Sequence, residues 1–316
     1  VEQLAREFPE DQRLELERLS LLRNQTRRED RLTTYERLCA KKESHPIFWQ
    51  QYAQELRADD RRWEDARSLL RRAIARWPSE GANYMTLAYL YWDRRRYEEA
   101  LELHRIAACL GDKDEQLVMA YFSAADWFKQ TDVAFAMLKD RFARFGRKSS
   151  DPARTLSSAY TQLDRYGEAL EVVEEALRLR PDDGELMLYA ADLYSASSLE
   201  YLPRTRELVE LARGKVPRAQ WLRTAARLAT SEDRFQDALA LWREVVELAP
   251  LAVDAHTAVA RLLFSLTGDA AAQRHLAEAC ERFPHHIPLH ELWVEWIRDE
   301  PAEVREPIVR KLIEAG

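Results

Sequence analysis

This chain is poor in glycine and cysteine, and it has no long apolar run. Eight of its 316 residues are glycine, which is typical of helical proteins because they need few left-handed turns. No apolar stretch approaches the roughly 18 residues of a membrane-spanning helix, and no secretory start is visible. Cys39, Cys109 and Cys280 are widely separated without metal-ligand spacing, which predicts buried thiols in a reducing compartment. We therefore expect a cytoplasmic protein with no membrane partner.

Motifs for catalysis and for nucleic-acid binding are also missing. The sequence contains no glycine-rich phosphate loop, no Gly-x-Ser-x-Gly and no His-Glu-x-x-His. His104 and Cys109 lie five residues apart, which places them on different faces of one helix. The formal net charge of −7 disfavours nucleic acid as a partner, because phosphate binding needs a basic face. The sequence predicts no enzyme, no catalytic residue and no cofactor.

The chain does contain a repeat with steps of 33 to 36 residues. A fixed period in this range is typical of stacked supersecondary units. Two small residues seven positions apart mark each copy, and on one helix face they let a neighbouring helix approach closely. The first of the two is Ala66, Ala100, Ala134, Ala169, Thr205, Ala238 and Ala272, and the second is Ala73, Ala107, Arg141, Ala176, Ala212, Val245 and Ala279.

Each copy also has an upstream helix and a downstream stop. The upstream segments carry apolar residues at spacings of three and four, for example Leu87, Ala88 and Tyr91, which indicates an amphipathic helix. Proline cannot continue a helix, and it follows the second small residue by five positions in most copies. These prolines are Pro78, Pro181, Pro217, Pro250 and Pro284.

The whole unit resembles the tetratricopeptide repeat, a helix–turn–helix of about 34 residues. The resemblance covers residues 46–316 and is clearest in 83–112, 153–183 and 255–286. It implies an all-α fold, a right-handed superhelical solenoid of about eight antiparallel helix pairs.

Some segments depart from this pattern. The copy at 115–146 has Thr131 where other copies have a large side chain, and Arg141 in place of the second alanine. Residues 46–56 and 289–300 are instead similar to the related half-a-TPR repeat. These departures affect local geometry rather than the predicted fold.

We expect residues 1–316 to form a single array, with degenerate N-terminal helices in 1–45 and repeats in 46–316. Residues 4–11 read as the tail of a second helix, and the chain ends in the last turn of another. Since an array normally closes with a capping helix whose outer face is polar, we expect this chain to be a segment of a longer protein.

A group of histidines near the C-terminus has two interpretations. His285, His286 and His290 fall within six residues, with His275 one helix earlier. Zinc would need three or four such ligands to converge. His290, however, occupies the same repeat position as His256, where side chains pack between repeats, and we predict no metal site.

The resemblance implies that the first helix of each pair lines a concave groove. In that register Met85, Tyr89, Trp92 and Met119 form an apolar and aromatic patch on adjacent helices, a composition common at adaptable protein-binding surfaces. The alternative is that Tyr89 or Trp92 packs against the next repeat.

A second patch on later helices is cationic. Arg223, Arg227 and Arg261 would stand together and receive carboxylates from an acidic segment. Leu188 falls on the same predicted face. The alternative is that these arginines pair with aspartates or glutamates of the chain itself.

The predicted function is a protein–protein interaction scaffold that binds a peptide or protein segment, acidic or amphipathic in character, in its groove. The alternative is a regulatory or substrate-recruiting region of a larger enzyme whose catalytic domain lies outside this segment.

Overall fold

The computed structural model describes residues 14, 15, 17, 19, 28–111 and 113–315, and the segment 4–11 discussed above lies outside them. Over the described residues the chain forms α-helices and two 3₁₀ turns, with no strand. The chain divides into two compact units, residues 1–159 and 160–316. The predicted all-α solenoid class is confirmed, whereas the single continuous array over 1–316 stays a prediction.

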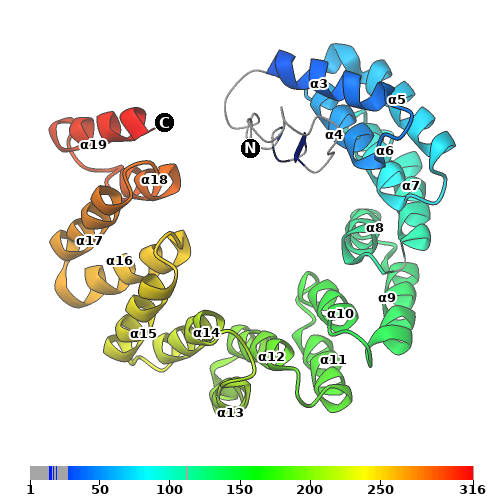
Figure 1. The fold of residues 1–316 in the computed structure, drawn as a ribbon. Coiled ribbons are helices and arrows are strands. Elements are labelled where there is room, and N and C mark those ends of the chain that lie inside the picture. Colours follow the sequence, from blue (N-terminus) through cyan, green and yellow to red (C-terminus); the bar gives the residue numbers. More distant parts are fainter. Residues whose placement is uncertain (1–13, 16, 18, 20–27, 112, 316) are drawn as a thin grey trace. The chain divides into compact units, whose positions relative to one another are not determined.

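In the first unit each helix from α3 to α9 packs on the next one along the chain (Figure 1). The first helices of adjacent repeats also touch, α4 on α6 and α6 on α8. The helices are α3 (Arg28–Ala40), α4 (Pro46–Arg57), α5 (Trp63–Arg76), α6 (Gly81–Asp93), α7 (Tyr97–Leu110), α8 (Glu115–Trp127), α9 (Thr131–Phe145) and α10 (Asp151–Thr161), within which the division between the units falls.

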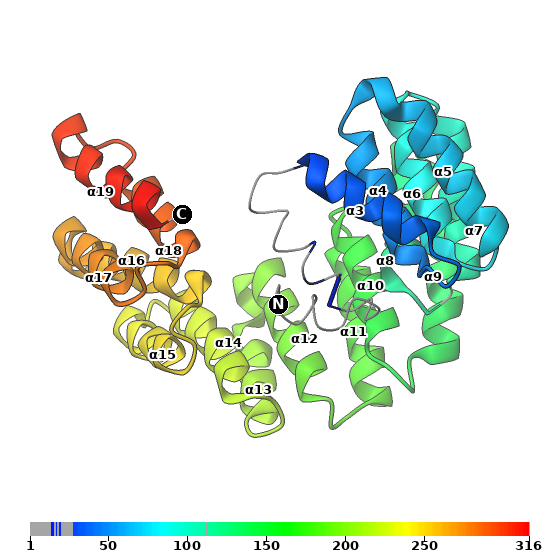
Figure 2. The same ribbon diagram turned by 45° about the horizontal axis from the view of Figure 1, so that its top comes forward.

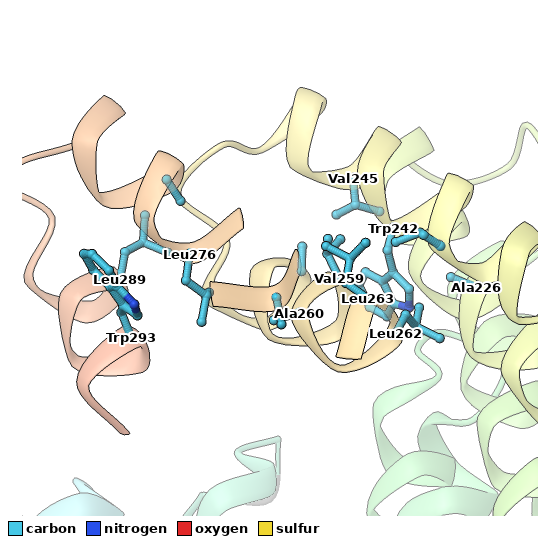
Figure 3. Packing of buried hydrophobic residues seen from close by; sticks show 14 of the residues in the cluster. Ala226, Trp242, Val245, Val259, Ala260, Leu262, Leu263, Leu276, Leu289 and Trp293 are labelled. Atoms are coloured by element: carbon cyan, nitrogen blue, oxygen red, sulfur yellow. The ribbon is translucent and has the colours of Figure 1, made fainter. Parts of the chain in front are cut away.

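The second unit repeats this arrangement, with α12 on α14 and α16 on α18 as contacts between first helices. Figure 3 shows part of its core, where Trp242 of a second helix lies beside Val259 and Leu263 of a first helix. The helices are α11 (Tyr166–Leu179), α12 (Gly184–Ser197), α13 (Leu202–Ala212), α14 (Arg218–Ser231), α15 (Phe235–Leu248), α16 (Val253–Thr267), α17 (Asp269–Arg282), α18 (Ile287–Trp296) and α19 (Ala302–Ala315).

The small residues that define the period are buried at helix crossings. Ala66, Ala100, Ala169 and Ala238 have no exposed surface, as expected where a methyl group is all that separates two packed helices. These positions therefore allow a close approach of packed helices within each unit.

The turn inside several pairs has one shared backbone conformation. Arg95, Lys129, Asp164 and Asp233 occupy the same repeat position with φ of 57–58°, although none is glycine. In each case the next residue donates its N–H to a carbonyl five positions back, as from Arg96 to Tyr91 at 3.0 Å. This hydrogen bond satisfies a carbonyl at the helix end and offsets the strain of the left-handed residue.

Replacing Ala169 with leucine should overpack one of these crossings and lower the free energy of unfolding by about 1–3 kcal/mol. Urea denaturation of both proteins measures the difference. The matched control is Ala240→Leu on the exposed face of α15, which should change stability little. If both substitutions changed the free energy of unfolding equally, the helix crossing at Ala169 would not be specifically sensitive to a larger side chain.

Candidate partner-binding surfaces

Helices α6 and α8 bring together the four residues of the predicted apolar patch. Met85, Tyr89 and Trp92 lie on α6 and Met119 on α8, two helices that lie side by side (Figures 1 and 2). All four line one cavity of about 500 Å³. The walls are mainly apolar, with few polar groups, which is the composition of typical ligand pockets. Its role in binding a partner stays a prediction.

An exposed aromatic cluster adjoins this cavity. We define it as Trp92, Tyr97 and Trp127, whose ring centroids lie 5.1–6.0 Å apart. Trp92 and Trp127 meet edge to face at 5.9 Å, a favoured geometry for aromatic pairs. Trp127 is 63% exposed, so the cluster presents a large ring to the surroundings. The repeat register predicted Trp92 as part of this surface, but not Tyr97 or Trp127.

Trp92 is partly buried because it packs on the ring of Tyr97 and on that of Trp127. Tyr89 is likewise partly buried, with its ring 5.1 Å from that of His104. The alternative interpretation, packing onto the next repeat, thus holds for part of the Trp92 ring through Trp127, whereas Tyr89 packs on His104 of its own helix pair. Another part of each ring faces the cavity.

An ion pair between neighbouring first helices lies beside the cavity. Arg57 at the end of α4 donates to Asp93 at the end of α6, with Nη2 2.7 Å from Oδ1. The hydrogen bond to Asp93 raises the pKa of the Arg57 guanidinium above its ordinary value. That cation also lies 5.6 Å from the centroid of the Tyr89 ring, which restrains the ring through a cation–π contact.

His104 of α7 contributes an imidazole to the cavity wall. It is 2% exposed, and its Nδ1 has no hydrogen-bond partner among the described residues. Burial lowers its pKa to about 4, since desolvation disfavours the charged imidazolium. The ring is therefore neutral at neutral pH.

The second unit contains a cavity of about 610 Å³ that includes two of the three predicted arginines, Arg227 and Arg261. Arg227 is paired with Asp192, Nη2 to Oδ2 at 2.7 Å. Arg261 is exposed and forms no ion pair within the part of the chain that the structure describes. Of the predicted cluster, Arg261 is thus the side chain with its donors available.

Arg223 does not line this cavity. Its Nε lies 2.7 Å from Oδ2 of Asp254 on α16, and the hydrogen bond from Arg223 lowers the pKa of the Asp254 carboxyl. The pairing that we considered as the alternative is therefore present for Arg223 and Arg227.

Two smaller expectations were wrong. Leu188 is 2% exposed rather than lining a groove, because α12 buries residues around most of its circumference between α11, α13 and α14. Cys109 is exposed, whereas Cys39 and Cys280 are buried as expected. Burial raises the pKa of the Cys39 thiol to about 12, which makes it unreactive at neutral pH.

The histidines of the second unit pack inside it. His256 Nε2 lies 2.9 Å from the carbonyl oxygen of Pro250 and must donate, so its Nδ1 accepts from His275 Nε2 at 3.1 Å. His290 is buried as well. Over the described residues no three His, Cys, Asp or Glu side chains come together as metal ligands, and no helix is long and apolar enough to cross a membrane.

Comparison with known families agrees with this architecture. Two sequence models, each described as a tetratricopeptide repeat, match residues 55–114 and 155–183. The chain is a helical repeat protein of the tetratricopeptide type. Such repeats generally provide scaffolds for protein interaction, and proteins that contain them generally bind proteins or peptides.

Individual relatives are distant. The crystal structure of yeast Tom70 is 16% identical with a TM-score of 0.54, over 91% of this chain and 58% of that one, and shows the fold alone. A thermophilic TPR protein of Thermus thermophilus is 22% identical with a TM-score of 0.43, over 58% of this chain and 99% of that one. Human protein O-mannosyl-transferase TMTC1 is 29% identical over 101 residues, 32% of this chain. The match spans 11% of that relative's length.

Lowering the pH from 7 to 5 should destabilise the protein through His275. Burial, with smaller effects of His256 and Arg243, lowers its pKa to about 4, below the ordinary value near 6.5. The unfolded chain therefore takes up the proton first as the pH falls, and stability that is present above about pH 6.5 is lost on the order of 1–2 kcal/mol by pH 5.

Urea denaturation at the two pH values measures this loss. His275→Gln keeps a donor for His256 without titrating, so it should reduce the pH dependence. The pH dependence that remains in this variant would include the effect of His104, whose lowered pKa also destabilises the fold as the pH falls. An unchanged dependence would assign the whole loss to groups other than His275.

Proposed function

We propose that this chain is a non-catalytic scaffold that binds a segment of a partner protein in the cavity of its first unit. The observation that carries the proposal is the exposed aromatic cluster joined through Trp92 to a cavity lined by Met85 and Met119. Methionine adapts its shape to a partner, and tryptophan and tyrosine are among the side chains most enriched at binding hot spots. An exposed tryptophan also costs solvation free energy in the unbound protein, which binding would recover.

The cavity of the second unit suits a polar part of the partner. Arg261 has unpaired guanidinium donors, and the same cavity includes the hydroxyl-bearing residues Ser195, Thr230 and Ser265. A carboxylate would gain charge-assisted hydrogen bonds there. We therefore propose a partner with apolar side chains for the first unit and acidic side chains for the second.

The net charge bears on the class of partner, and the cysteines bear on the cellular compartment. The net charge of −7 repels nucleic-acid phosphates at long range. Cys39, Cys109 and Cys280 are free cysteines, as expected for a reducing compartment. We propose a cytoplasmic location and no nucleic-acid partner.

A second candidate function is a substrate-recruiting region of a larger enzyme. It is favoured by the 101-residue match to part of protein O-mannosyl-transferase TMTC1. Mass spectrometry of the endogenous protein distinguishes the two candidates, because peptides from a catalytic domain on the same polypeptide would support the second one.

Removing the aromatic rings should weaken partner binding while the fold persists. Tyr89→Ala together with Trp92→Ala should cost about 2 kcal/mol or more if these are hot spots, and Trp127→Ala alone should also weaken binding. A partner recovered from the native lysate is titrated against each variant by calorimetry. Leu199→Ala, at a side chain 67% exposed in the second unit, is the control. Full affinity in folded variants of the aromatic cluster would exclude this surface.

Reversing the charge of Arg261 should slow association with an acidic partner and flatten its dependence on salt, since steering is electrostatic and screened. Stopped-flow rates for Arg261→Glu at low and physiological ionic strength measure this. Arg274→Glu makes the same charge change at an exposed position of α17 outside the cavity. Equal slowing by both variants would indicate net charge rather than a site.

A further inference from the structure

One position in the second helix of each repeat is buried and, with one exception, apolar. It lies four residues after the first small residue of the repeat. The exception is His104 on α7, which is as deeply buried as the others. The apolar members are Leu70, Leu138, Val173, Val209, Trp242 and Leu276.

The histidine at this position packs against the ring of Tyr89, but the fold leaves one of its ring nitrogens unsatisfied. Its Nδ1 has no hydrogen-bond partner among the described residues, and a buried polar group without a partner costs free energy that a leucine would not. Most other repeats avoid this cost with an aliphatic side chain. His104 lines the cavity beside Met85, Tyr89 and Met119, as its counterpart Trp242 lines the cavity of the second unit, so a group bound there could reach its ring.

We infer that the cavity of the first unit receives a tyrosine side chain of the bound segment, with the phenol hydroxyl hydrogen-bonded to His104. This inference rests on the proposed function and names the side chain that the cavity selects.

The walls favour an uncharged aromatic ring. Methionine sulfur and the rings of Tyr89 and Trp92 make favourable contacts with an aromatic occupant. A carboxylate would lose its hydration beside a neutral imidazole, at a cost that no lining cation offsets. An ammonium or guanidinium would likewise lose its hydration, because no carboxylate lines the cavity.

The hydroxyl group distinguishes tyrosine from the other aromatic side chains. A neutral imidazole offers one donor and one acceptor, and the tautomer of His104 decides which of them is available. A phenol can both donate and accept, so it satisfies either tautomer. An indole can only donate, and phenylalanine would leave the imidazole nitrogen without a partner.

The experiment uses p-cresol and toluene, the side-chain analogues of tyrosine and phenylalanine, with the full chain. Nuclear magnetic resonance titration reports binding at the cavity. We expect p-cresol to bind about tenfold more tightly than toluene, the effect of one net hydrogen bond. Toluene is the more hydrophobic probe, so this order cannot arise from apolar burial alone.

His104→Leu restores the residue type of the other repeats. We expect it to raise the melting temperature and to remove the preference for p-cresol, leaving toluene bound at least as tightly. His290→Leu is the matched control, because His290 is also buried, with both ring nitrogens unpartnered among the described residues, but lies in α18 outside the cavity. It should leave the preference unchanged.

Equal binding of the two probes to the unmodified protein, tighter binding of toluene, or no binding of either would overturn the inference. That comparison needs no variant, so it stands even if His104→Leu does not fold. The proposed function fails separately, when a recovered partner binds the Trp127→Ala and Tyr89/Trp92 variants with full affinity.

Discussion

The close crossing of helices at buried small residues is the constraint on which the rest of the structure depends. Ala66, Ala100 and Ala169 have no exposed surface, and a larger side chain there would separate the helices that it joins. Because the small residue recurs with the period, the other positions of the repeats acquire similar environments within each unit. A residue's place in the period therefore says whether it is buried, lies in a turn or faces outward.

This regularity explains why so much of the fold was predictable. The positions of the helix pairs follow from the period, and even His290 and His256 are buried where the register places them. The shared left-handed turn was not predicted, since Arg95 and Lys129 are not the residue types that signal positive φ. At these turns the backbone conformation is determined by the hydrogen bond at the helix end. The residue types alone do not indicate that bond.

The candidate sites were predictable in part. Register placed Met85, Tyr89 and Trp92 on one surface, but it could not show that Asp192 and Asp254 would neutralise two arginines, because those partners come from neighbouring repeats. Trp127 was missed although a signal existed. It directly follows Asp126, the position one 34-residue step after Trp92. Trp127 was therefore missed because it lies one position outside the register that predicted Trp92.

Two residues that depart from the repeat pattern differ in whether their polar atoms find partners within the chain. Arg141 replaces an alanine and is 1% exposed, yet its Nη2 lies 2.5 Å from Oε1 of Glu115 at the start of α8. Its charge is thus paired with Glu115 of the same repeat, and the pair joins α8 to α9, although Nε and Nη1 of Arg141 have no hydrogen-bond partner among the described residues and Arg141 also lines a cavity. His104 is buried to a similar degree, but no group of the described chain answers its Nδ1, and its ring borders a cavity. His104 differs from Arg141 in forming no side-chain hydrogen bond with the described chain, at a position where the other repeats use leucine, valine or tryptophan, and for this reason we infer a bound group there.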